Sequence, residues 1–217
     1  GRNHHSLPRR RTSHKGDDTM RSMVRVQGVV KLPLIEGKHS MIPFNVLTLE
    51  GIPEEFRGVA DSMLKGVKRE AGTAFFTIHG RKLTAGGTLR RGGPHTDGNY
   101  EPHLMSFGGG GGNGWKVGQD GPAINTALHG RQYNNERGGI IMASNYEACL
   151  GWVGVYDGLP NTGGDCSHLD LGRPFVLSRN VVYYGNNHFI HESLPVAHDV
   201  HRVLARITMP EDHSYER

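Results

Sequence analysis

Cysteine is scarce in this chain. Cys149 and Cys166 are the only two among 217 residues, and no C-x-x-C pair occurs. This scarcity argues against a disulfide framework and against a zinc knuckle, which both need several closely spaced cysteines. We therefore expect an intracellular protein, located in the cytoplasm, the nucleoid or the nucleus.

Long apolar runs are also missing. No stretch approaches the length of a membrane span, and the amino-terminal residues lack the apolar core of a secretory signal. Membranes are therefore not expected among the partners of this protein.

The excess of positive charge is confined to one end of the sequence. The formal net charge is +4, and residues 1–23 hold six of the 25 basic residues but only two of the 21 acidic ones. The remaining 19 basic and 19 acidic residues cancel. Residues 1–23 therefore read as a disordered basic leader or tag, and residues 24–217 as a single domain.

Glycine and proline are plentiful, with 32 and 11 residues, and this favours a turn-rich β protein. Apolar residues at helical spacing predict one helix over 53–69, which would brace a sheet from outside. The five glycines at 108–112 exclude a regular element there and indicate a loop or lid at about 106–123. Strands are expected at 24–34, 44–49, 74–78, 88–91, 140–143, 150–156, 175–184 and 202–209.

The motif His95-Thr96-Asp97 is the first sign of chemistry. Residues i and i+2 of a strand point to the same face, so the imidazole and the carboxylate can bind one ion while Thr96 points away. Two imidazoles and one carboxylate form the facial site that holds non-heme Fe(II) with open positions. His191 is the best third ligand, although His188, His198 and His201 crowd the same region.

The last expected strand carries a candidate anion site. Arg202, Leu204, Arg206 and Thr208 share one face of it. A guanidinium with a hydroxyl two residues away suits a carboxylate, because both donate hydrogen bonds and one is permanently charged. Arg206 with Thr208 is preferred, and Arg202 is the alternative.

These residues together resemble the Fe(II)/2-oxoglutarate-dependent dioxygenase superfamily: H-x-D, a distal histidine followed by Pro195 and Val196, then Arg-x-Thr. Arg206 follows His191 by 15 residues and is the first residue of the tripeptide Arg-Ile-Thr. This is similar to the ten-eleven translocation and J-binding-protein branch, which oxidises the methyl group of 5-methylpyrimidines in DNA. Arg202, at 11 residues, fits the commoner spacing.

The resemblance implies a double-stranded β-helix, or jelly roll, with Fe(II) bound by His95, Asp97 and His191. It implies 2-oxoglutarate bound by Arg206 and Thr208, dioxygen as co-reactant, and oxidation of 5-methylcytosine in DNA to 5-hydroxymethylcytosine. Hydroxylation of a protein side chain or a small metabolite remains an alternative, as does a non-catalytic jelly-roll binding module.

Recognition of a methylated base requires polar and aromatic groups around an extracted nucleotide. The candidates in this sequence are Asn99, Tyr100, Trp115, Asn186 and Asn187. Arg90 and Arg91, next to the H-x-D motif, are candidates for contacts with DNA phosphates.

Overall fold

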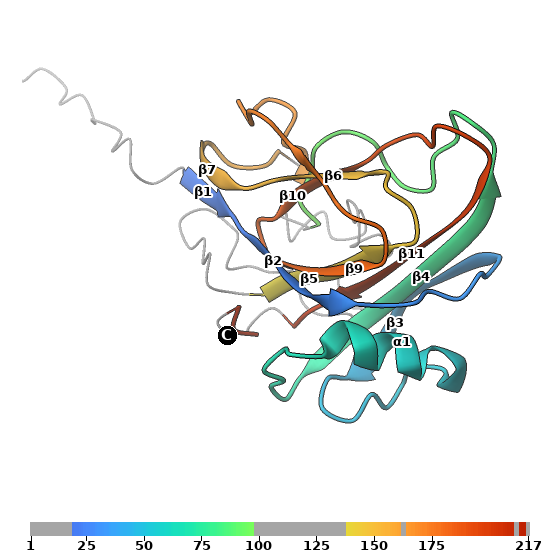
Figure 1. Cartoon of the computed structure of the whole chain (residues 1–217). Helices are drawn as coiled ribbons and strands as arrows, with labels where there is room; N and C mark the ends of the chain where they lie inside the picture. The colour runs from blue at the N-terminus through green and yellow to red at the C-terminus, as the bar shows by residue number, and fades with distance from the viewer. Residues whose placement is uncertain (1–18, 98–137, 162–163, 211–212, 216–217) are drawn as a thin grey trace, which may run out of the picture.

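The computed structural model describes residues 19–97, 138–161, 164–210 and 213–215. Within these ranges the chain forms eleven strands and one helix, and every strand pair is antiparallel. The prediction of a mainly β protein with one bracing helix is confirmed (Figure 1).

A six-stranded sheet forms the larger layer. Its strands run in the order β2 (Val24–Val29), β9 (Val181–Asn186), β5 (Gly138–Ser144), β11 (Val200–Thr208), β4 (Thr73–Leu83) and β3 (Gly37–Asn45). The last strand in sequence, β11, is therefore central, between β5 and β4. Residues 204–208 of β11 are therefore paired on both sides, which fixes the direction of their side chains.

The second layer is smaller. It consists of β10 (Ile190–Ser193), β6 (Cys149–Trp152) and β8 (Phe175–Val176), and a separate pair joins β1 (Thr19–Ser22) to β7 (Gly154–Asp157). In Figure 1, β6 and β10 lie above the six-stranded sheet, while the helix α1 lies below it. This arrangement is consistent with the expected jelly roll.

The helix α1 spans Glu54–Leu64 and is shorter than the predicted 53–69. Glu54 and Glu55 occupy its first turn, where negative charge favours the helix dipole. It ends before Gly66, whose φ of 81° belongs to the left-handed region. Its buried side chains, Phe56, Val59, Ala60, Met63 and Leu64, pack in one core cluster with residues of the six-stranded sheet.

Alternation along β11 decides which side chains face the second layer. Val203, Ala205 and Ile207 belong to the core cluster that contains α1. Arg202, Leu204 and Arg206 therefore point the other way, into the space between the two layers. The core of the fold thus forces two arginines into the interior.

Sequence predictions for three segments, 88–91, 44–49 and 19–22, were wrong. Residues 88–91 form bends rather than a strand, and the strand expected at 44–49 already ends at Asn45, where a turn begins. Residues 19–22 are not part of a leader, since they form β1, and Met20 is buried in a small core cluster. A short strand whose partner is distant in sequence leaves little periodic signal.

No helix among the described residues is long and apolar enough to cross a membrane.

Candidate metal centre

His95 and His191 are held opposite each other by the backbone. The amide of His95 donates to the carbonyl of His191 at 3.0 Å, and the amide of His191 donates back at 2.9 Å. Residues that exchange both bonds in an antiparallel pair have their side chains on the same side. The two imidazole rings accordingly lie with their centroids 4.7 Å apart.

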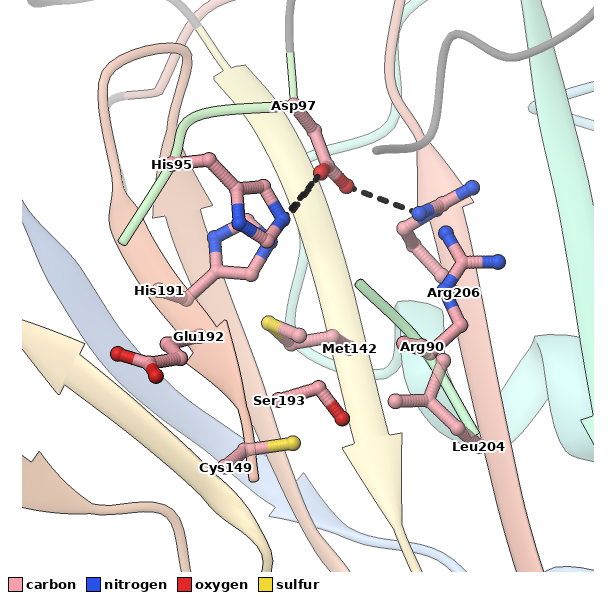
Figure 2. A pocket seen from close by; sticks show the side chains of 10 residues that line it. All are labelled: Arg90, His95, Asp97, Met142, Cys149, His191, Glu192, Ser193, Leu204 and Arg206. Atoms are coloured by element: carbon pink, nitrogen blue, oxygen red, sulfur yellow. Dashed lines mark hydrogen bonds and ion pairs between the residues drawn. The ribbon is translucent and has the colours of Figure 1, made fainter. Parts of the chain in front are cut away.

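Asp97 completes the group. Its Oδ1 lies 3.2 Å from Nε2 of His191 and 3.6 Å from Nε2 of His95 (Figure 2). Bonds of about 2.1 Å to one ion, at right angles, would separate neighbouring donor atoms by about 3 Å. The three sequence-predicted ligands are therefore brought together, and this cluster can hold a metal ion.

Both imidazoles are oriented with Nε2 toward Asp97. Nδ1 of His95 lies 2.6 Å from the carbonyl oxygen of Gly93, and Nδ1 of His191 lies 3.1 Å from that of Phe189. A carbonyl can only accept, so each Nδ1 carries a proton, and each Nε2 is left facing the carboxylate of Asp97. Burial, followed by the neighbouring His191, lowers the pKa of His95 to about 3, which keeps this ring neutral.

The segment that carries His95 and Asp97 approaches the backbone of Gly164 closely. The amide of Thr96 donates to the carbonyl of Gly164 at 2.9 Å. Gly164 has a φ of 83°, and a Cβ atom there would lie 2.2 Å from the carbonyl oxygen of Thr96. Only glycine fits this position, so Gly164 helps to place both ligands.

Arg206 forms an ion pair with Asp97. Its Nη1 lies 3.0 Å from Oδ2 of Asp97, and both side chains are only 3% exposed. Burial alone would raise the pKa of Asp97, but the charges of Arg206 and His191 outweigh it and hold that pKa well below its usual range. The carboxylate is therefore ionised, with one oxygen directed to the histidines and the other to Arg206.

Arg202, the alternative anion-binding residue, has a different environment. It is fully buried, and its guanidinium donates to Oγ of Ser193 at 3.0 Å, to the carbonyl of Ala148 at 3.2 Å and to Sγ of Cys149 at 3.1 Å. Arg206 lines the pocket beside the cluster and Arg202 does not. The structure thus favours Arg206 of the two candidates.

Thr208 lies on the same face of β11 as Arg206 but is not among the pocket-lining residues. Its Oγ1 is buried and has no hydrogen-bond partner. Buried hydroxyls are normally satisfied, so an unsatisfied one next to a candidate anion site deserves a test as a ligand-binding group.

A pocket of about 300 Å³ opens beside the three ligands. Its lining consists of Arg90, His95, Asp97, Met142, Cys149, His191, Glu192, Ser193, Leu204 and Arg206 (Figure 2). Sequence reasoning missed Met142, Cys149 and Ser193, because they come from strands whose pairing is not local. Alternation along β5 and β10 is the only signal that could have suggested them.

Arg90 is a pocket residue rather than a surface one. Burial, together with the nearby charge of Arg206, lowers its pKa to about 10. Arg91, by contrast, is exposed. Sequence reasoning placed both arginines near the metal motif, but it did not foresee that only Arg90 faces the pocket.

The predicted substrate-binding residues are only partly described by the structure. Asn99, Tyr100, Trp115 and the glycine-rich loop at 106–123 lie outside the described residues. Asn186 is buried away from the pocket, where its amide donates to the carbonyl of Arg21 at 2.7 Å and accepts from the amide of Met23 at 3.1 Å. Asn186 thus anchors the chain after β1, and neither Asn186 nor Asn187 lines the pocket.

The competing histidines are accounted for elsewhere. His188 is fully buried, His198 packs edge-on against the ring of Tyr146, and Nε2 of His201 lies 2.7 Å from the carbonyl of Ile35. His191 is the one that meets His95 and Asp97.

Comparison of the chain with protein-family models, with curated proteins and with solved structures finds no significant match. The argument for function therefore depends on the geometry and chemistry of this pocket.

Proposed function

We propose that the protein is an Fe(II)- and 2-oxoglutarate-dependent dioxygenase. One observation carries the proposal: two imidazoles and one ionised carboxylate converge at the wall of a pocket that also contains guanidinium groups. Two nitrogen donors and one oxygen donor suit Fe(II) and leave coordination positions open on the pocket side.

The charges in the pocket support a dianionic cosubstrate. Arg90 and Arg206 balance Asp97 and Glu192 among the lining residues. A divalent ion would leave two positive charges, which the two carboxylates of 2-oxoglutarate would neutralise. Arg206 and the unsatisfied Oγ1 of Thr208 are the candidate donors for the distal carboxylate.

The protein's own contribution is to bind, orient and exclude water. When bound, Fe(II) and 2-oxoglutarate would let dioxygen oxidise a C–H bond, with succinate and carbon dioxide as coproducts. His95 and His191 hold their Nε2 atoms toward the ion through the Nδ1 contacts, and Met142 and Leu204 make part of the wall apolar. An apolar wall strengthens the electrostatic contacts inside the pocket.

The substrate that we propose is 5-methylcytosine in DNA, with 5-hydroxymethylcytosine as product. Support comes from the 15-residue spacing between His191 and Arg206 and from the Arg-Ile-Thr ending. 2-Oxoglutarate would bind inside the pocket, on the open side of the three candidate ligands. A flipped base would then sit at the mouth.

Two experiments test this function. An anaerobic titration with Fe(II) and then 2-oxoglutarate should give the visible absorption of the ternary complex, and a binding module would give none. Aerobic incubation with 5-methylcytosine DNA, followed by digestion to nucleosides, should add one oxygen to the mass of 5-methyldeoxycytidine, with thymidine as internal comparison. Succinate formation without an oxidised pyrimidine would reject the DNA substrate and favour a protein or metabolite hydroxylase.

A further inference from the structure

Lys38 lies on the pocket side of the six-stranded sheet. On β3 it pairs with His79 of β4, and His79 pairs with Leu204 of β11. Directly paired residues of neighbouring strands share a face, and Leu204 lines the pocket. The exposed side chain of Lys38 therefore stands at the sheet edge on the same face as the pocket.

Arg81 extends this feature along β4. It lies two residues from His79, so both side chains share the face, and it pairs with the inward-facing Arg202. Its side chain is exposed, and its Nη2 lies 3.5 Å from the carbonyl of Thr88, in the loop that leads to Arg90. The basic edge, defined here as Lys38, Arg81 and Arg90, thus runs from the rim of the sheet into the pocket.

The pKa values of His79 and Lys38 agree with the closeness of these cations. Burial, followed by the charges of Arg90, Lys38, Arg81 and Arg202, lowers the pKa of His79 to about 4. Burial, Arg90 and Arg206 also lower the pKa of Lys38. The charges that lower the pKa values of His79 and Lys38 are all positive, so several cations gather on this side of the sheet and their potentials add.

This side of the sheet carries more positive charge than the proposed cosubstrate would neutralise. With a divalent ion and dianionic 2-oxoglutarate, the pocket lining is already neutral, and Lys38 and Arg81 remain outside it. We propose that the basic edge binds backbone phosphates of a nucleic-acid substrate beside the nucleotide that enters the pocket. This inference rests on the proposed function, because that function is the reason to expect a substrate at the pocket mouth.

Phosphodiester chains fit this edge better than a single small anion. The exposed cations come from two strands, so they can contact successive charges of one extended polyanion. Lys38 pairs with His79, so Lys38 and Arg81 are diagonal neighbours on adjacent strands, separated by roughly 7–8 Å, whereas a lone phosphate would occupy only one position. Contacts of this kind release counterions and depend steeply on salt.

The test compares two double variants with the same change in charge. Lys38→Gln/Arg81→Gln removes two cations from the basic edge, and Lys65→Gln/Lys68→Gln removes two exposed cations at the end of α1, on the opposite face of the sheet. Binding of a fluorescein-labelled oligonucleotide containing 5-methylcytosine, single-stranded and duplex, is measured by anisotropy as salt is raised. The full chain is used, and no iron or turnover is needed.

We expect the basic-edge variant to lose about tenfold or more in affinity near 0.1 M salt, and its salt slope to fall by roughly 0.7–0.9 per lost contact. The Lys65/Lys68 variant should stay within about twofold of the wild type. Equal losses in both variants would show that only net charge matters and would overturn the proposal. Equally strong competition by polyglutamate at matched charge would overturn the assignment to phosphate.

The measurement also separates this proposal from the proposed function. Oxygenase activity can be absent while the basic edge still binds DNA, which would refute the enzyme and keep the binding surface. Conversely, oxidised cytosine with wild-type affinity in the Lys38/Arg81 variant would keep the enzyme and refute the surface.

Discussion

Arg202 and Arg206 lie four residues apart on the same face of β11, yet their side chains have different partners. Arg202 donates to a serine hydroxyl, a backbone carbonyl and a thiol, and burial raises the pKa of that thiol, Cys149, despite the arginine beside it. Arg206 pairs with the carboxylate of Asp97. Because all its acceptors are neutral, Arg202 serves the packing of the interior. Arg206 pairs with the charged Asp97 and so belongs to the candidate metal site.

The same contrast separates two histidines that are three residues apart. His188 is enclosed by the core, and burial lowers its pKa to about 3. His191 lines the pocket with Nε2 toward Asp97. Residue type therefore does not identify a site in this chain, and the neighbours of each side chain do. The predictions below test this contrast.

The largest effect is expected for His191→Ala compared with His188→Ala. Loss of a metal ligand should cost more than the 10–100-fold typical of residues behind the ligands, so affinity for Co(II) should fall at least about 100-fold and succinate formation should stop. His188→Ala should lower stability but keep metal affinity in the folded protein. Full turnover by the His191 variant together with a loss in the His188 variant would reverse the assignment of the third ligand.

The Arg206–Asp97 pair should show strong coupling in the metal-free protein. Arg206→Met leaves a buried carboxylate without its cation and should lower the free energy of unfolding by about 3–5 kcal/mol. Adding Asp97→Asn to Arg206→Met should restore much of this loss, because the charge that needed a partner is gone. Urea unfolding of the two single variants and the double variant measures the coupling, and simple additivity would contradict it.

Arg202→Met should act on stability alone. Its loss leaves the Ser193 hydroxyl and other buried groups without a donor, which should cost about 2–4 kcal/mol in urea unfolding. Metal affinity, measured on the folded variant in the absence of denaturant, should stay within about threefold of the wild type, since Arg202 touches no ligand. A fall in metal affinity as large as that of His191→Ala would place Arg202 in the site.

The last effect is absent at neutral pH and appears only in acid. Above pH 6.5, His188 is neutral in both the folded and the unfolded chain. Below that pH the unfolded chain binds a proton that the folded one refuses, since its pKa is about 3. His188 should therefore lower the free energy of unfolding by up to about 1.4 kcal/mol for each pH unit below about 6, down to about pH 3.

Urea unfolding at several pH values measures this dependence, and His188→Asn, which cannot take up a proton in this range, should flatten it. A matched change at the exposed His168, His168→Asn, should leave the dependence unchanged. An equal slope in the wild type and the His188 variant would show that other groups cause the acid sensitivity.

Local periodicity explains how much of the fold could be predicted. The alternation of β11 and the helical spacing of α1 depend on residues close in sequence, and both elements were predicted with errors only at their ends. The H-x-D spacing also fixes the relation of His95 to Asp97 locally. It holds even though the expected strand at 88–91 is absent, because a single bridge to His191 gives His95 the same extended geometry.

The sequence by itself determined a mainly β protein and two candidate ligands, His95 and Asp97, with His191 as the preferred third. Only the tertiary structure decided which histidine meets His95, which arginine meets Asp97, that Arg90 faces the pocket and that Asn186 serves as an anchor. These outcomes depend on the register between strands far apart in the chain. A shift of one residue in that register turns every side chain to the other face, and no local pattern records which register is formed.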